Sequence, residues 1–169
     1  MKTAFWLFFA AMTAVYAVML LWTLPTITAA AGGLTPFDLR PMGYSIEEAR
    51  AFLAALSDDG RALYLDTQLR IDTVYPVLLM VTLALATILL TSPGWPRWLL
   101  IAPAVLGMVF DLLENNVTGR MLRGGTEGLT EQLVEQGSRW SILKSGFTTI
   151  SMTAVIVLLA SHFLARRRV

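Results

Sequence analysis

Residues 98–117 read WLLIAPAVLGMVFDLLENNV, and this stretch decides how the chain is organised. The first 13 of these residues, 98–110, carry no charge. As a helix they would span only about 20 Å at ~1.5 Å per residue, less than the ~30 Å hydrocarbon core of a bilayer. A helix that crosses the membrane here must therefore continue to about residue 117. The helix carries Asp111 and Glu114 into the membrane, and Asp111 is expected roughly 9 Å below the outer boundary of the apolar core.

Three further stretches have the length and apolar character of membrane-crossing helices. Proline, glycine or a run of arginines follows each of them, and Pro25 is expected to stop the first. We therefore predict an all-α integral membrane four-helix bundle that forms a single domain over residues 1–169. The predicted spans are residues 5–24, 71–91, 98–117 and 143–164, and the predicted loops on the far side are 25–70 and 118–142.

The composition excludes several classes of protein. Hydrophobic residues make up 56% of the chain and charged residues only 15%, whereas charged residues are about a quarter of an average soluble domain. There are no cysteines, which argues against thiol–disulfide oxidoreductases and disulfide-bonded junction proteins. A net charge of +1 gives no reason to expect a nucleic-acid partner.

Charge placement predicts the orientation in the membrane. If the N-terminus is cytoplasmic, the inner segments contain Lys2, Arg97 and the arginines at 166–168, and all 12 acidic residues lie towards the opposite side. This is the pattern of the positive-inside rule. We expect both termini in the cytoplasm and, from the small size and lack of cysteine, a bacterial inner membrane. The first span resembles a secretory signal, but its apolar run of about 20 residues exceeds the ~7–15 of a signal core, so we expect it to be retained.

The long loop contains a helix with a clear start. Ser45 and Glu48 have the spacing of a capping box, and apolar residues follow at steps of three and four. We expect this helix to pack on the mouth of the bundle, to end near residues 57–60, and to be followed by one continuous helix from Arg61 into the second span. A separate short helix is expected at 131–135. The apolar stripe consists of Ile46, Ala49, Phe52, Leu53 and Leu56.

Polar residues at one end of three spans form the candidate site. Acids placed within the apolar core are costly and are functional candidates by default. Pro76 also leaves the carbonyl of Asp72 without its helical partner, and Gly107 allows a neighbouring helix to come close. A ridge of small hydroxyl residues on the fourth span (Ser141, Ser145, Thr149 and Thr153) suits such an approach. The predicted binding residues are Asp72, Tyr75, Asp111, Glu114, Asn115 and Lys144.

Two other interpretations of the acids stay open. Lys144, Arg70 or Arg120 would form a structural ion network if it paired with Asp111 and Glu114, above all if no cavity lay beside the pair. In the other interpretation, the acids lie at the start of an ordinary loop that is exposed at the membrane interface. A metal ion is weakly indicated and would be a hard cation such as Ca²⁺ or Mg²⁺. His162 is about 27 Å along the fourth helix from Lys144 and cannot contribute. We predict neither a metal site nor a cofactor.

Three functions fit the sequence. The favoured one is a non-enzymatic module that binds a lipid, a small hydrophobic molecule or a partner helix in an acidic pocket of the outer leaflet. The alternative is a membrane enzyme that uses Asp111 or Glu114 as general acid or base on a lipid-like substrate. The third is a proton- or cation-coupled carrier, which would have to be a dimer because four helices make a thin pathway. The sequence does not indicate the oligomeric state.

Overall fold

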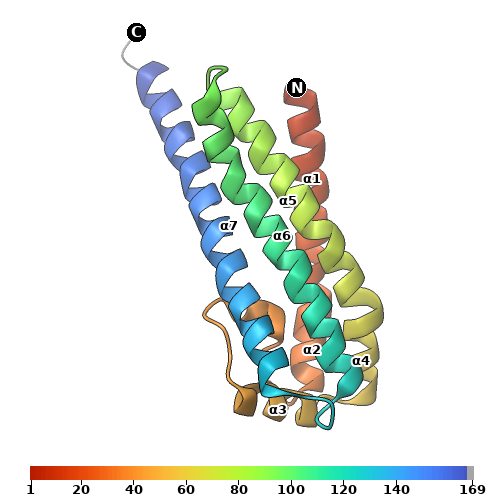
Figure 1. The fold of residues 1–169 in the computed structure, drawn as a ribbon. Helices are drawn as coiled ribbons and strands as arrows, with labels where there is room; N and C mark the ends of the chain where they lie inside the picture. Colours follow the sequence, from red (N-terminus) through yellow and green to blue (C-terminus); the bar gives the residue numbers. More distant parts are fainter. Residues whose placement is uncertain (167–169) are drawn as a thin grey trace.

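The computed structural model describes residues 1–166, and over this range the regular structure is helical. Four helical rods are long and apolar enough to cross a membrane, which confirms the expected all-α bundle. They run side by side, with Lys2 and Arg166 at one end, the termini end, and the longer connections at the other, the loop end (Figure 1). The rods in the described part are Lys2–Ala30, Asp58–Leu90, Trp95–Gly124 and Glu131–Leu164.

The first rod does not stop at Pro25, contrary to the prediction from the sequence. It consists of α1 (Lys2–Val18), a π-helical turn (Met19–Thr23) and α2 (Leu24–Ala30). Pro25 lies in the first turn of α2, where a missing amide hydrogen is tolerated. The wider turn before it adjusts the register, since the amide of Leu24 donates to the carbonyl of Met19, five residues back.

The capping box begins α3 (Ile46–Ala55), as predicted. The amide of Glu48 donates to Ser45 Oγ (3.2 Å), and the amide of Ser45 donates to the Glu48 carboxylate (2.7 Å). The apolar stripe of α3 packs into the hydrophobic core at the loop end, so the helix covers the bundle mouth as expected. Residues 57–60 break the helix but also begin the next one, because Ser57 Oγ accepts from the amide of Gly60 and caps α4 (Asp58–Leu63).

The second rod confirms the expected continuous entry into the second span. It joins α4, a π-helical turn (Tyr64–Gln68) and α5 (Leu69–Leu90). The second predicted loop, 118–142, is largely helical. Helix α6 (Trp95–Gly124) continues past residue 117, and the expected short helix at 131–135 is the start of α7 (Glu131–Arg166). The sequence has no proline between 131 and 166, so nothing ends α7 where a separate helix was expected.

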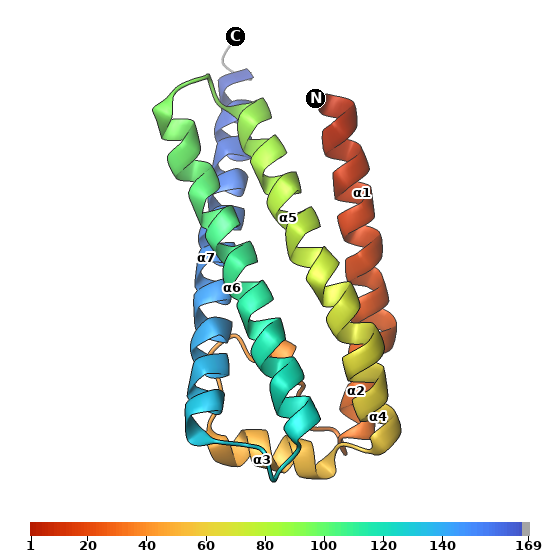
Figure 2. The same cartoon turned by 45° about the vertical axis from the view of Figure 1, so that its right-hand side comes forward.

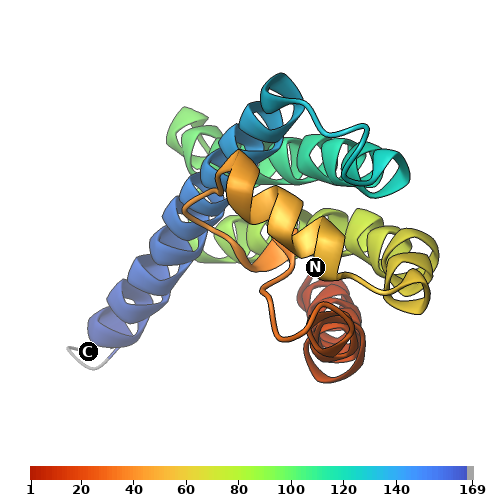
Figure 3. The ribbon, with the colours of Figure 1, turned by 90° about the horizontal axis from the view of Figure 1, so that it is seen from below.

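Rods that follow one another in the chain pack side by side. Helix α1 packs on α5, α5 on α6 and α6 on α7, and α5 also contacts α7 (Figures 2 and 3). Gly107 lies at a close approach between α6 and α7: a Cβ there would lie 2.9 Å from Thr148 Oγ1 and 3.3 Å from its backbone nitrogen. The contact on α7 is thus Thr148, and the predicted hydroxyl ridge is displaced from it, since Thr149 and Thr153 are exposed.

Burial differs between the two ends of the bundle. The larger hydrophobic core lies at the loop end, where α3 and the long loop close over the rods. Along the rods, by contrast, large apolar side chains are exposed, including Leu21, Ile156 and Leu164. A surface of this kind is normally covered by lipid or by another protein. The four apolar rods and their exposed surface indicate an integral membrane protein.

Candidate functional site

Lys144 on α7 joins the two acids of α6. Its Nζ lies 3.2 Å from Asp111 Oδ1 and also contacts Glu114 Oε2. Asp111 and Glu114 are three residues apart, so both project from one face of α6 towards α7. The Lys144 and Asp111 side chains are 13% and 12% exposed and that of Glu114 is fully buried, so this is an ion pair removed from bulk water. One of the ion pairs considered from the sequence is therefore present.

Both carboxylate oxygens of Glu114 face polar groups of α7. Ser141, three residues before Lys144 on α7, donates its hydroxyl hydrogen to Glu114 Oε1. The other oxygen faces Lys144. A buried carboxylate held from both sides in this way is fixed in one position.

Asp72 on α5 differs from these two acids. Its side chain is 2% exposed, and its Oδ2 has no hydrogen-bond partner among the described residues. The backbone carbonyl of Asp72, which Pro76 deprives of its helical donor, accepts instead from Asn115 Nδ2 at 2.8 Å. The backbone group is therefore satisfied, whereas the carboxyl group is buried with one oxygen unpaired.

The sequence did not reveal the fourth acid, Asp38. It lies in a 3₁₀ turn (Phe37–Leu39) of the long loop, which the fully buried ring of Phe37 anchors in the loop-end core. Gln68 Nε2 donates to Asp38 Oδ2 at 3.2 Å, and Thr23 donates its hydroxyl hydrogen to Gln68 Oε1. The only signal in the sequence was an aromatic residue followed by an acid inside a proline-containing loop, which does not reveal where the loop folds.

The surroundings of Asp38 favour its neutral form. The residue is only partly buried, but burial is the largest cause of a rise in the pKa of its carboxyl above the usual value. The positive charge of Lys144 lowers the pKa and offsets part of that rise, while Asp111 raises it further. Asp38 therefore belongs electrostatically to the same cluster as the acids of the helices.

These groups meet in a cavity of about 330 Å³. Its polar wall includes Asp38, Asp72, Asp111 and Lys144, and part of its apolar wall comes from the first rod and α5. We call it the acidic cavity. The remaining lining residues come from the first rod, the long loop, α5 and α7: Tyr16, Met19, Leu24, Leu39, Pro41, Tyr75, Leu79, Ser145, Thr148 and Thr149.

An apolar cleft lies next to the acidic cavity, on the side of the termini end. It has a volume of about 280 Å³ and lies between α1 and α7, with α5 along its length. Leu79 of α5 lines both spaces. A molecule with a polar end and an apolar tail would meet matching surfaces along this path.

The structure brings most of the predicted site residues together. Asp72, Tyr75, Asp111 and Lys144 line the acidic cavity. Glu114 lies behind Lys144, and Asn115 lines a different groove, between α5 and α6. Arg70 instead pairs with Asp66 at 3.9 Å, so it does not close the network that was considered for it. The assignment of the six residues to a binding site stays a prediction.

The charges of the cluster do not balance. Among the described residues, the carboxyl groups of Asp38, Asp72, Asp111 and Glu114 all act on the single ammonium group of Lys144. Buried charges are costly unless they are paired, so some of these carboxyls must be neutral or must meet a further hydrogen-bond donor or cation. Within residues 1–166, no three His, Cys, Asp or Glu side chains are grouped closely enough to hold a metal ion.

Comparisons with known protein families, curated proteins and solved structures find no match for this chain.

Proposed function

We propose that this chain is a small polytopic membrane protein, with both termini in the cytoplasm, that binds a lipid-like amphipathic molecule in the acidic cavity. The proposal assigns the polar end of the ligand to the acids at the loop end and its apolar tail to the cleft between α1 and α7. In this orientation the cavity lies in the outer leaflet, and the membrane is a bacterial inner membrane. Of the predicted set, Asp72, Tyr75, Asp111 and Lys144 bind the ligand, and Asp38 is added to them. Glu114 positions Lys144 from behind, and Asn115 lines the separate groove between α5 and α6.

One observation carries the proposal: Asp72, whose buried carboxyl oxygen Oδ2 has no hydrogen-bond partner among the described residues, lines a cavity that shares Leu79 with a neighbouring apolar cleft. A buried polar atom without a partner is costly, at about 1–3 kcal/mol, and a ligand that donates a hydrogen bond removes that cost. The excess of carboxyl groups over the ammonium group of Lys144 also favours a ligand that donates hydrogen bonds. We therefore expect the polar end of the ligand to carry hydroxyl or amine hydrogens.

The enzyme alternative has less support in the geometry. Asp111 and Glu114, its proposed acid and base, are both engaged by Lys144, whereas a general base must be free to take a proton from its substrate. The carrier alternative lacks polar groups for a pathway, because the cleft towards the termini end is lined mainly by apolar residues such as Phe9, Leu83 and Val155.

Native mass spectrometry of the gently extracted protein tests the proposal. We expect the wild type to carry a bound amphiphile, and Thr149→Trp, which fills the cavity, to lose it. The matched control is Thr153→Trp, one turn further along α7 and exposed outside both cavities. Equal retention by wild type and Thr149→Trp would overturn the proposal, as would a mass showing that a second protein chain, rather than a small molecule, is lost from Thr149→Trp.

A further inference from the structure

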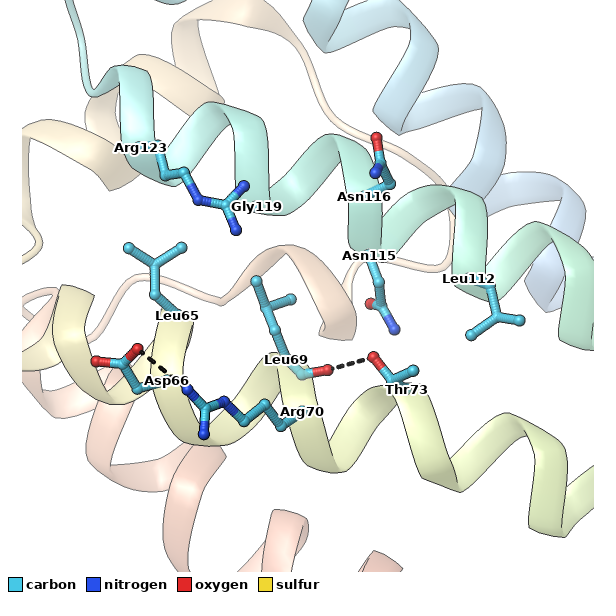
Figure 4. Close-up of a pocket in the computed structure, with 10 residues that line it drawn as sticks. All are labelled: Leu65, Asp66, Leu69, Arg70, Thr73, Leu112, Asn115, Asn116, Gly119 and Arg123. Carbon is cyan, nitrogen blue, oxygen red and sulfur yellow. Dashed lines mark hydrogen bonds and ion pairs between the residues drawn. The ribbon is translucent and has the colours of Figure 1, made fainter.

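A second site lies between the second rod and α6, on the groove that contains Asn115. Its volume is about 480 Å³. Leu65 and Leu69 extend from the second rod towards α6, while Asn115 and Arg123 extend from α6 towards the rod (Figure 4). The groove thus combines an apolar floor with polar side chains from both the second rod and α6. We call it the α5–α6 groove.

A glycine leaves room for the Arg123 side chain over the groove. Its side chain folds back over Gly119, one turn earlier on α6, and a Cβ at Gly119 would lie 3.3 Å from Arg123 Nη1 and 3.3 Å from Leu69 Cδ1. The absence of a side chain at residue 119 therefore leaves room for the guanidinium group. In the part of the chain that the structure describes, no carboxylate forms an ion pair with Arg123.

Arg70 borders the same groove from α5. Its only ion pair among the described residues is with Asp66, at 3.9 Å, and the two side chains are 79% and 73% exposed. Exposed pairs of this kind contribute little to stability. A ligand that offers a better acceptor can therefore recruit the guanidinium group of Arg70 at little cost.

Asn115 supplies an unsatisfied acceptor in the groove. The residue is 7% exposed and lines the groove, and no described residue is hydrogen-bonded to its Oδ1. Its Nδ2 donates to the carbonyl of Asp72, which fixes the orientation of the amide and leaves Oδ1 as the free atom. A group that fills this position must donate a hydrogen bond.

We propose that the α5–α6 groove binds the head group of a phospholipid, with the phosphate diester between Arg70 and Arg123. Guanidinium groups bind phosphate through strong, charge-assisted hydrogen bonds. The free Asn115 Oδ1 selects head groups with an N–H or O–H donor, so phosphatidylethanolamine and phosphatidylglycerol fit and phosphatidylcholine does not. The apolar floor formed by Leu65, Leu69 and Leu112 accepts the start of an acyl chain. This site is separate from the acidic cavity and does not depend on the ligand proposed there.

Lipid titration of the detergent-purified, delipidated protein, read by native mass spectrometry, tests the proposal. We expect phosphatidylglycerol and phosphatidylethanolamine to bind more tightly than phosphatidylcholine. Loss of a hydrogen bond to a charged group costs about 1.5–3 kcal/mol, so Arg70→Gln or Arg123→Gln should weaken phosphatidylglycerol binding about tenfold or more. Arg50→Gln, at an exposed position on α3, is the matched control and should not change binding.

Two further measurements test the position of the Arg123 guanidinium group and distinguish a bound lipid from free phosphate. Gly119→Ala keeps both arginines but displaces the Arg123 guanidinium group, so it should also weaken phosphatidylglycerol binding. Inorganic phosphate at millimolar concentration should not displace the lipid, and displacement would show that the groove binds free phosphate instead. Unchanged phosphatidylglycerol binding in the Arg70→Gln, Arg123→Gln double variant would overturn the proposal, as would equal binding of all three lipids by the wild type.

Discussion

The side-chain amide of Asn115 donates a 2.8 Å hydrogen bond to the backbone carbonyl of Asp72. That carbonyl would normally accept from the amide of residue 76, but proline at this position has no amide hydrogen. A side chain of α6 therefore completes a backbone hydrogen bond of α5 and ties the two helices together. The same bond orients the Asn115 amide in the α5–α6 groove.

A double-mutant cycle tests this relationship. Asn115→Ala should lower the free energy of unfolding by about 1–3 kcal/mol, because it leaves a buried carbonyl without a donor. In a Pro76→Ala background the new amide can donate to Asp72 instead, so the same change should cost distinctly less. The measurement is the thermal or denaturant stability of the four proteins in one detergent. Additive effects within about 0.3–0.5 kcal/mol would show that the two residues are not coupled.

Loss of Lys144 should be more damaging than loss of the whole ion cluster. Lys144→Met leaves Asp111 and Glu114 buried without their cation, and breaking a buried pair costs about 3–5 kcal/mol. The triple variant Lys144→Met, Asp111→Asn, Glu114→Gln removes the charges together and should recover much of that stability. Melting temperatures of the single and triple variants give the comparison. A triple variant no more stable than Lys144→Met would contradict the paired geometry.

The double variant Asp111→Asn, Glu114→Gln separates a structural role from a binding role. If the acids shape the acidic cavity for its ligand, the variant should insert normally and lose the co-purifying amphiphile. If they only close an ion network, the main effect should be a lower melting temperature with the ligand retained. Native mass spectrometry and a melting curve on the same preparation distinguish the two results.

Close packing of α6 on α7 makes Gly107 sensitive to the smallest substitution. Gly107→Ala places a methyl group 2.9 Å from Thr148 Oγ1 and 3.3 Å from its backbone nitrogen, so the helices must separate, at about 1–3 kcal/mol. Gly146→Ala is the matched control, because a Cβ there has no neighbour within 4 Å. We expect it to be neutral or stabilising by up to about 1 kcal/mol. Equal melting temperatures for the two variants would show that α6 and α7 are not in close contact.

Asp38 should make stability depend on pH. Its pKa is raised, chiefly by burial and partly offset by Lys144, so the folded chain favours the neutral acid. The stabilising contribution is therefore full below the unfolded pKa of about 3.9 and is lost as the pH rises through the folded pKa. Asp38→Asn should consequently melt higher than the wild type at pH 7, and this gain should vanish at about pH 4 and below.

Melting curves between pH 4 and pH 8 measure this effect, since 1 kcal/mol moves the melting temperature of a chain of this size by roughly 2–4 °C. The control is Glu127→Gln, which removes an exposed carboxylate from the short loop before α7 and should leave the pH profile unchanged. A difference between wild type and Asp38→Asn that is constant with pH would contradict the raised pKa.

The main architecture was predictable because it depends on local patterns. Apolar length locates three of the four rods, the length needed to cross a bilayer extends the third span through Asp111 and Glu114, and the spacing of Ser45 and Glu48 locates the start of α3. The three-residue step from Asp111 to Glu114 correctly placed both carboxylates on one helix face, within reach of Lys144. Each of these inferences uses residues that are neighbours on one helix, or a property summed over one segment.

The errors arose where distant contacts determine the structure. Pro25 does not end the first rod, because a π-helical turn precedes it, and such turns have no clear sequence signal. The start of α7 has the pattern of a separate short helix, but it packs into the loop-end core through Leu133 and Val134 and continues into the fourth rod. Asp38 enters the cluster only because Phe37 is buried among residues far away in the sequence.

Site-specific photo-crosslinking gives the most direct test of amphiphile binding in the acidic cavity. Tyr75 lines this cavity, and replacing it with p-azidophenylalanine changes its shape little. Phe163, exposed near the end of α7, receives the same replacement as a control that samples bulk lipid. We predict that residue 75 captures one amphiphile with hydroxyl or amine hydrogens, enriched over its abundance in the membrane. Capture at residue 75 of the same lipid mixture as at residue 163, or of protein alone, would contradict the account.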